Sequence, residues 1–361
     1  MIYLLTSIPL LKENLIIAEE LFGSIAEGSA SLRLQELPFA KAAISLQRAC
    51  LIINLSGEGE LKLDPPMGSH LMIGKVRSDQ KHSSIISLEE KIDSTLASFK
   101  GRGTISVIFS DNHFGGLKYR SKLYKRILNN ADRVVSPNSF LLKLANIYSP
   151  NSDKYLIPDV CQISKKTFQP VCGKVFKIIW FGQGRNVAFL LQSISNLIMV
   201  DTPGMTFELS ILTNEFYFEK IKLALWSIFN KSNRKHIVSR WEFRLVPWNM
   251  SRQPHQLEEE LHRADISFIP SDPDDDVKKY VSTNRLVDSL RSGCVCISAE
   301  LPSYAEFADV SFQGSDYASN LKSVVKDYPE ICDEFNSRLS NRLNNYSESS
   351  ILKMWQQLVV L

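Results

Sequence analysis

Cysteine is scarce in this chain, with six residues in 361. No two of them form a Cys-x-x-Cys pair, and none stands with histidine at the spacing of a zinc finger. The sequence therefore lacks both a disulfide framework and a recognisable structural zinc site, and we expect reduced thiols. Cys294 and Cys296 alternate along a strand-like run, a pattern typical of small buried hydrophobic side chains.

The chain also lacks a long apolar run and an excess of charge of one sign. Its apolar first stretch is interrupted by four charged residues, Lys12, Glu13, Glu19 and Glu20. That stretch is well short of the ~18 apolar residues that a membrane helix needs, and it has neither the basic start nor the cleavage site of a signal peptide. Lysine and arginine total 42 against 39 acidic residues, a formal charge of +3, so nucleic acid is not an expected partner. We expect a cytoplasmic protein and leave a peripheral contact with the inner membrane surface open.

Composition and length predict a folded protein of two domains. Hydrophobic residues make up 44% of the chain and charged residues 22%, which excludes a disordered or collagen-like chain. A length of 361 residues predicts two domains of roughly 150 to 200 residues each.

Short apolar, β-branched runs alternate with stretches of helical period in both halves. The expected strands are 2–5, 49–54, 70–73, 105–109 and 133–135 in the first half, and 176–181, 206–212, 241–247, 266–269 and 295–298 in the second. The expected helices are 12–22, 38–47, 87–99, 117–129, 140–147, 187–200, 216–230, 255–264 and 282–292, with a late helical region from 315. This alternation predicts an α/β fold in which parallel sheets are covered by helices on both faces.

A change in composition marks the domain boundary. Residues 149–175 are richer in Pro, Lys, Ser and Asn than their flanks. We expect an N-terminal domain over 1–155, a linker over 156–175, a C-terminal domain over 176–340 and a terminal helical segment over 341–361. The last segment places five apolar residues on one helix face, Ile351, Leu352, Trp355, Leu358 and Val359. We expect that face to pack back on the domain interface.

Polar side chains that follow strands of the second half are the first candidates for a binding site, because ligands of parallel sheets bind at the carboxyl ends of the strands. In IIWFGQGRN, Gly182 and Gly184 lead from a strand into a helix that begins near Asn186. Glycine permits close approach of the backbone, the free amides of a helix start favour an anion, and Arg185 adds a positive donor. The pattern indicates an anion-binding turn, whereas a plain tight turn would need no ligand.

The run KKYVSTNRLVDSLRSGCVCIS is the strongest motif in the chain. Three cations stand near a helix start, Lys278, Lys279 and Arg285. The candidate caps for the free amides of that helix are Ser282, Thr283 and Asn284. A diphosphate would suit this cationic helix start. Asp288 follows Arg285 by three residues, so its carboxylate could accept hydrogen bonds from two ribose hydroxyls, or could form an ordinary solvated ion pair with Arg285.

Two further loops carry candidate catalytic side chains. In LPSYAEF, Glu306 is either a substrate contact or a carboxylate favoured by a helix dipole. In the first half, Asp111 and His113 follow the expected strand 105–109. Imidazole titrates near neutral pH, so His113 is the first candidate for a general base and Asp111 is the second. The acidic run over 271–276 lacks the spacing and the glycine of a calcium loop, so we expect no metal site there.

Taken together, these motifs resemble those of GT-B glycosyltransferases, in particular the nucleotide-sugar-dependent enzymes of the group 1 or family 4 type. NRLVDSLRSGCVCIS followed by LPSYAEF resembles their donor-binding signature. RVVSPNSFLLKL with YLIPDV resembles the hinge region of that fold, WFGQGRN its first C-terminal βα turn, and ADISFIPSD the strand that precedes the donor site. The resemblance covers roughly residues 131–310 and implies two Rossmann-like domains that face each other across a cleft.

The resemblance implies a hexosyltransferase-like enzyme of polysaccharide or glycoconjugate biosynthesis. A sugar would pass from a nucleoside-diphosphate sugar to a hydroxyl of a glycan, a lipid-linked molecule or a small molecule. Arg285 would contact the donor phosphate, Asp288 the ribose, and Glu306 the sugar or its neighbouring phosphate. Arg185 and the amides near Gly184 would hold the diphosphate. Enzymes of this fold resemble metal-independent catalysts, so we expect no metal and no tightly bound cofactor beside the nucleotide-sugar co-substrate.

One position departs from the family pattern. Retaining enzymes of this fold often carry a glutamate eight positions before the ribose carboxylate, and here that position is Tyr280. The sequence therefore leaves a retaining or inverting outcome open. It also leaves open a nucleotide-sugar epimerase or a non-catalytic nucleotide-sugar-binding subunit, because a fold does not determine a reaction.

Overall fold

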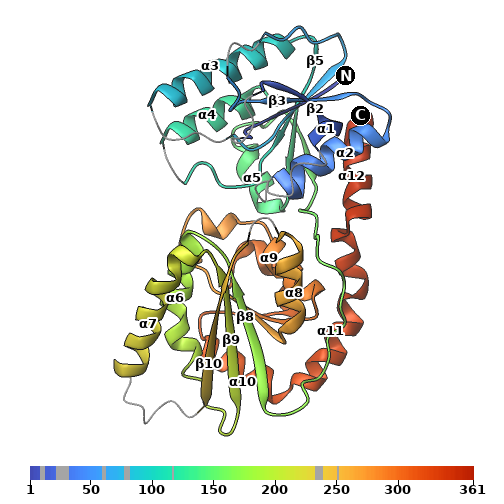
Figure 1. Ribbon diagram of the computed structural model, residues 1–361. Coiled ribbons are helices and arrows are strands. Elements are labelled where there is room, and N and C mark those ends of the chain that lie inside the picture. Colours follow the sequence, from blue (N-terminus) through green and yellow to red (C-terminus); the bar gives the residue numbers. More distant parts are fainter. Residues whose placement is uncertain are drawn as a thin grey trace. The chain divides into compact units, whose positions relative to one another are not determined.

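A computed structural model describes the chain over residues 1–8, 13–21, 32–58, 62–76, 82–115, 118–231, 239–249 and 252–361. The chain forms two compact units, each an α/β structure built on one sheet (Figure 1). Unit 1 comprises Met1–Val160, Tyr280–Thr283 and Tyr346–Leu361. Unit 2 comprises Cys161–Lys279 and Asn284–Asn345.

The sheet of unit 1 has the strand order β2-β3-β1-β4-β5-β6-β7. Its strands are β1 (Ile2–Thr6), β2 (Leu15–Ile17), β3 (Cys50–Asn54), β4 (Ser69–Ile73), β5 (Gly103–Ile108), β6 (Arg133–Ser136) and β7 (Asp153–Leu156). β2 pairs antiparallel with β3, and the other neighbours are parallel. The carboxyl ends of the parallel strands therefore meet at one edge of the sheet, where polar side chains of different strands can lie close together.

The helix expected over 12–22 is wrong over residues 13–17 and is confirmed only for the single turn at 18–21. The chain there forms the edge strand β2 and then the single helical turn α1 (Ala18–Leu21). Ile16 is buried while Leu15 and Ile17 are exposed, which is the two-residue period of a strand rather than the period of a helix. Pairing with β3 satisfies the backbone, so a tertiary contact overrides the local helical preference.

Helices cover both faces of the unit 1 sheet because alternate residues of its central strand enter two different cores. The helices are α2 (Leu37–Ser45), α3 (His82–Phe99), α4 (Lys118–Asn129), α5 (Ser139–Asn146) and α12 (Glu348–Val360). Ile2 and Leu4 pack in the core that contains residues of α2 and α12. Tyr3 and Leu5 pack in the core that contains residues of α3, α4 and α5.

The C-terminal helix α12 belongs to unit 1 and lies beside α2 (Figure 1). Ile351, Trp355, Leu358 and Val359 are buried, as the apolar spacing predicts, and Leu352 is partly buried against the same core. The ring of Trp355 packs edge to face on a phenylalanine of α2 at 5.7 Å between centroids. The last residues of the chain thus complete the core of the unit that contains the first.

The segment Tyr280–Thr283 is held in unit 1 by hydrogen bonds to residues that follow β6 and β7. The side chain of Asn138 donates to the carbonyl oxygens of Tyr280 and Val281, at 3.4 and 3.3 Å. The Ser282 hydroxyl donates to Asp159, which also accepts from the amide of Gln35. These contacts explain why the helix expected over 282–292 begins only at Asn284.

The sheet of unit 2 is entirely parallel and has the strand order β10-β9-β8-β11-β12-β13. Its strands are β8 (Val175–Phe181), β9 (Thr206–Thr213), β10 (Arg240–Pro247), β11 (Ile266–Ile269), β12 (Val295–Ser298) and β13 (Phe312–Gln313). The helices are α6 (Arg185–Leu197), α7 (Phe218–Lys231), α8 (His255–Arg263), α9 (Asn284–Arg291), α10 (Tyr317–Lys326) and α11 (Tyr328–Arg342). In Figure 1, α6 and α7 lie on one side of this sheet and α8 and α9 on the other. The strand order reverses between β8 and β11, which is where parallel sheets of this type bind ligands.

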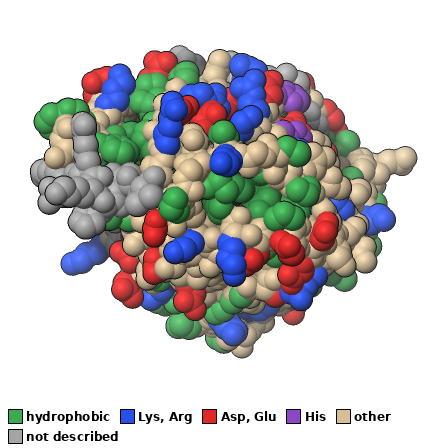
Figure 2. Space-filling model, turned by 90° about the horizontal axis from the view of Figure 1, so that it is seen from below, with side chains coloured by type: hydrophobic (Ala, Val, Ile, Leu, Met, Phe, Trp, Pro, Cys, Tyr) green, Lys and Arg blue, Asp and Glu red, His purple; other side chains and the backbone are tan. Residues whose placement is uncertain are grey.

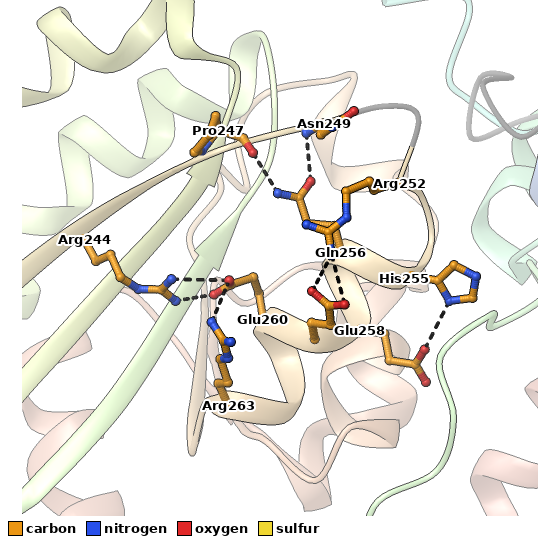
Figure 3. Close-up of polar contacts among 10 residues, drawn as sticks. Arg244, Pro247, Asn249, Arg252, His255, Gln256, Glu258, Glu260 and Arg263 are labelled. Atoms are coloured by element: carbon orange, nitrogen blue, oxygen red, sulfur yellow. Dashed lines mark hydrogen bonds and ion pairs between the residues drawn. The ribbon is translucent and has the colours of Figure 1, made fainter.

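Helix α8 is attached to β10 by buried polar contacts (Figure 3). The Gln256 side chain accepts from the Asn249 N–H and donates to the Pro247 carbonyl, both at 2.8 Å. The buried Glu260 carboxylate lies between Arg244 of β10 and Arg263 of α8. These contacts satisfy backbone groups at the end of β10 and orient the helix that leads into β11.

Replacement of Gln256 by alanine is expected to lower the free energy of unfolding by about 1 to 3 kcal/mol, because it leaves a backbone donor and a backbone acceptor without their partner. Gln192, which is exposed on α6, is the matched control, and its replacement should change stability by less than about 0.5 kcal/mol. Urea denaturation measures both variants. Equal midpoints for the two would contradict the assigned role of Gln256.

Asp159 is expected to make stability depend on pH. Burial raises its pKa to about 6 from an ordinary value of 3.8, although hydrogen bonds from Ser282 and Gln35 oppose this. The folded state therefore binds the proton more tightly than the unfolded state, and this group's contribution to stability falls as pH rises from about 4 to about 6. In urea denaturation, the free energy of unfolding of Asp159→Asn minus that of the wild type should increase by on the order of 1 to 3 kcal/mol as the pH rises from 4.5 to 7. Asp153→Asn, at an exposed position, should show no such gain.

Candidate functional site

The turn between β8 and α6 lies at the reversal point of the unit 2 sheet. Gly184 has φ 56°, a left-handed conformation that glycine adopts at little cost, and it precedes the first residue of α6. A Cβ on Gly182 would lie 3.0 Å from the Cβ of Asn186, so the strand end and the helix start approach closely. The free amides of the first turn of α6 thus stand directly beyond the end of β8. The backbone of Arg185 begins this helix, while its side chain lies outside the described part of the structure.

A lysine stands beside this helix start. The Nζ of Lys278 donates to the Oδ1 of Asn186 at 2.8 Å, and it lies 5.6 Å from the ring centroid of Phe189. The positive charge is therefore within one turn of the N-terminus of α6, where the helix dipole and the lysine both favour an anion.

Arg285 brings a second cation to the same strand end. Its Nη2 donates to the carbonyl oxygen of Phe181, the last residue of β8. Its Cζ lies 5.0 Å from the Phe181 ring centroid and 5.9 Å from that of Trp180. Burial lowers the pKa of Arg285, while the nearby Tyr304 and Asp288 raise it. The partly buried guanidinium has lost part of its hydration, so a bound anion would stabilise it.

Several buried polar atoms at this edge have no hydrogen-bond partner in the described ranges. These atoms are Arg285 Nε, Trp180 Nε1, Thr213 Oγ1, Ser298 Oγ and Ser303 Oγ. Thr213 and Ser298 are the last residues of β9 and β12, and Trp180 is next to last in β8. Buried polar groups are normally satisfied in native proteins, so this edge of the sheet offers hydrogen-bonding groups to a polar ligand.

The expected phosphate contacts around α9 are divided between the two units. Asn284 begins the helix, and its Oδ1 accepts from the Arg285 N–H at 2.8 Å. Lys279 forms an ion pair with Asp276 at 2.5 Å. Ser282 and Thr283 belong to unit 1, and the Ser282 hydroxyl donates to Asp159 rather than capping α9.

Asp288 lies on α9 one turn beyond Arg285, as its spacing predicts. Its Oδ1 accepts a hydrogen bond from the Sγ of Cys161 at 3.0 Å. Glu306 lies exposed in the middle of the 3₁₀ segment Pro302–Val310 rather than at its start. Its carbonyl oxygen accepts from Arg342 at 3.2 Å.

The candidate bases of unit 1 have different environments. Asp111 is partly exposed and forms an ion pair with Lys75. His113 is buried, with its ring stacked on Tyr124 at 3.6 Å between centroids. Burial lowers the pKa of His113 to about 3 against the opposing effect of Asp111, so its imidazole is neutral near pH 7. The Nε2 of His113 has no hydrogen-bond partner among the residues that the structure describes.

The sequence analysis does not identify the buried polar residues that lie near these candidate bases. The Glu36 carboxylate is 1% exposed and accepts from the Thr6 hydroxyl at 2.5 Å and from the Lys75 N–H at 2.8 Å. A Cβ on Gly74 would lie 2.6 Å from the Glu36 Cδ, so this carboxylate needs the glycine that follows β4. The one sequence feature that could have indicated this group is Gly74 followed by Lys75 directly after a strand. No local pattern around Glu36 or Asp159 indicates a functional or buried carboxylate.

Charges on the surface are mixed in sign where Figure 2 shows unit 2. Lysine and arginine side chains alternate with aspartate and glutamate side chains across that face, with hydrophobic side chains between them. This pattern differs from the one-signed basic surface that nucleic-acid binding uses.

Within the described ranges, no group of three or more His, Cys, Asp or Glu residues could hold a metal ion. In the acidic run, Asp272 and Asp275 accept backbone N–H groups at 2.9 and 2.8 Å, which stabilises turns. No helix in the part of the chain that the structure covers combines the length and apolar character needed to span a membrane.

No protein-family model matches the sequence, and no curated protein matches it. Solved structures do resemble it. HepE from Anabaena, determined in complex with UDP and glucose, has a TM-score of 0.58 at 11% identity, with all of both chains covered. OtsA has a TM-score of 0.59 at 8% identity, covering 99% of this chain and 98% of the other.

TarM from S. aureus, determined with fondaparinux, alpha-GlcNAc-glycerol and UDP, has a TM-score of 0.53 at 13% identity. The match covers 81% of this chain but only 55% of TarM, so this chain spans about half the length of that protein. Identities this low establish the fold alone. The α/β prediction and the family resemblance are confirmed at that level: the chain has a GT-B glycosyltransferase-like fold of two Rossmann-like units.

Proposed function

We propose that the chain is a glycosyltransferase that moves a sugar from a nucleoside-diphosphate sugar to a hydroxyl acceptor. The observation that carries the proposal is the partly buried guanidinium of Arg285 at the end of β8, in the same unit as Lys278 and the free amides of α6. Structural neighbours with this fold were determined with UDP, which makes UDP the first ligand to test.

In the proposed donor site, the diphosphate is bound by Arg285, Lys278 and the amides that follow Gly184. The bond between the anomeric carbon and the phosphate oxygen breaks, and the electron pair remains on the departing diphosphate. Positive groups stabilise this negative charge most effectively when they are oriented in advance and partly desolvated, as Arg285 is. This chemistry requires no metal, and the amides and cations of unit 2 supply the stabilisation.

The remaining donor contacts follow from the same assignment. Gly182 and Gly184 let the backbone approach the diphosphate, Asn186 orients Lys278, and Asn284 orients the start of α9. Arg185 and Lys279, which belong to the same unit, supply further polar contacts. Asp288 accepts hydrogen bonds from the ribose hydroxyls, and Glu306 contacts the sugar or its neighbouring phosphate.

For the acceptor, we propose Asp111 as the group that accepts the hydroxyl proton when the new glycosidic bond forms. Asp111 is partly exposed, so a substrate hydroxyl can reach its carboxylate, and the ion pair with Lys75 holds that carboxylate in place. Burial strongly opposes protonation of His113, so we assign it a positioning role as a neutral hydrogen-bonding group rather than that of the base. The acceptor itself is a hydroxyl of a glycan, a lipid-linked molecule or a small molecule.

The donor site is tested by thermal unfolding with UDP. Ligand at about 100 times its dissociation constant should stabilise the wild type by about 2.7 kcal/mol. Arg285→Ala should weaken UDP binding by about ten- to a hundredfold and lower transfer, because hydrogen bonds to charged groups are worth about 1.5 to 3 kcal/mol. Arg240→Ala, at a position whose side chain is 75% exposed, is the matched control and should bind UDP like the wild type. Full UDP binding and full transfer by Arg285→Ala would refute the proposal.

The base assignment is tested by the release of UDP from UDP-glucose and UDP-N-acetylglucosamine, with and without hydroxyl acceptors. Asp111→Asn should lower turnover by about 10²- to 10⁴-fold while UDP affinity stays within about twofold, since a general base acts on the acceptor. Asp93→Asn, at a half-exposed carboxylate paired with Arg126, should leave turnover unchanged. UDP binding without any turnover in the wild type would instead support a non-catalytic binding subunit, and conversion of the donor sugar without acceptor would support an epimerase.

A further inference from the structure

The Asp288 carboxylate has an unusual partner, the thiol of Cys161. The Sγ of Cys161 lies 3.0 Å from the Oδ1 of Asp288, whereas the next acceptor, the carbonyl oxygen of Ile163, lies at 3.9 Å. A thiol carries a single proton, so the shorter contact is the hydrogen bond. Cys161 is 5% exposed, so this contact is shielded from water on the thiol side.

The thiol remains a donor under ordinary conditions. Burial and the negative charge of Asp288 raise the pKa of Cys161 well above its usual value. A thiolate beside a carboxylate would be two like charges in contact, so the proton stays on sulfur and is directed at the carboxylate.

The segment that carries Cys161 is attached to the same helix that carries Asp288. The Nε of Arg291 on α9 donates to the carbonyl of Ile163 at 2.7 Å, and the N–H of Lys166 donates to the carbonyl of Arg291 at 2.8 Å. The segment that carries the thiol is therefore attached to α9 by two hydrogen bonds that do not involve Asp288, one from the Arg291 side chain and one between backbone groups.

We propose that Cys161 is a positioning residue that orients the Asp288 carboxylate for recognition of the nucleotide ribose. This inference rests on the proposed function, because it takes Asp288 as the ribose contact. A carboxylate that accepts from a thiol at one oxygen loses freedom of rotation, so the plane of its two oxygens is held in a fixed orientation toward the vicinal hydroxyls. The sulfur does not touch the ligand and acts only through Asp288.

The experiment compares the dissociation constants of UDP and 2′-deoxy-UDP by isothermal titration calorimetry. The wild type should bind UDP at least about tenfold more tightly than 2′-deoxy-UDP, since a buried group that loses its hydrogen-bond partner is costly. Cys161→Ala should reduce this ratio by about five- to tenfold, and Cys161→Ser, which keeps a donor, should restore most of it. Cys294→Ala is the matched control, because Cys294 is a buried thiol of the same unit that contacts the Leu261 carbonyl at 3.2 Å and should leave the ratio unchanged.

A loss of packing alone would weaken both nucleotides equally and leave the ratio as in the wild type. An unchanged ratio in Cys161→Ala therefore overturns the inference while leaving the proposed function standing. Failure of the wild type to bind UDP, ADP or GDP overturns both. Asp288→Asn keeps the side chain's volume, so it tests the same contact if Cys161→Ala fails to fold: a wild-type ratio in Asp288→Asn also refutes the inference.

Discussion

A guanidinium that is desolvated but only partly paired governs the chemistry available to unit 2. Arg285 donates to the backbone of β8 and lies over two aromatic rings, so water is displaced from one side of the cation. Asp288, a nearby carboxylate, accepts a hydrogen bond from a thiol. In the proposed donor site, a diphosphate at the start of α6 would stabilise the positive charge of Arg285.

This arrangement depends on how α9 is anchored. Leu286, Val287 and Leu290 are buried, which holds one face of the helix against the sheet. Arg285 and Asp288 lie on the remaining part of its surface, where one reaches β8 and the other reaches the segment at Cys161. The buried apolar face thus holds α9 in place, and with it the two polar side chains. Charged groups that are oriented in advance need little rearrangement when a ligand binds.

In unit 1, as in unit 2, polar side chains gather near the carboxyl ends of the parallel strands, but the buried groups there include two carboxylates. Glu36 and Asp159 are buried carboxylates near the carboxyl ends of parallel strands, and each is supported by hydrogen bonds from distant parts of the chain. Near them lies the ion pair of Lys75 and Asp111. Both carboxylates accept hydrogen bonds from the chain itself, and these bonds tie together segments of unit 1 that are distant in the sequence.

The sequence by itself determined the α/β class, most strands, the turn at Gly184 and the helix that carries Arg285 and Asp288, because these depend on local periodicity and on motifs a few residues long. It failed at β2, where an edge pairing replaced a helix, and it contained no signal for Glu36, Asp159 or Cys161. Only the tertiary structure decided that His113 is buried, that Ser282 bonds to Asp159 and that a thiol meets Asp288. Burial and partners of this kind arise when segments more than a hundred residues apart pack together, and no local pattern records that packing.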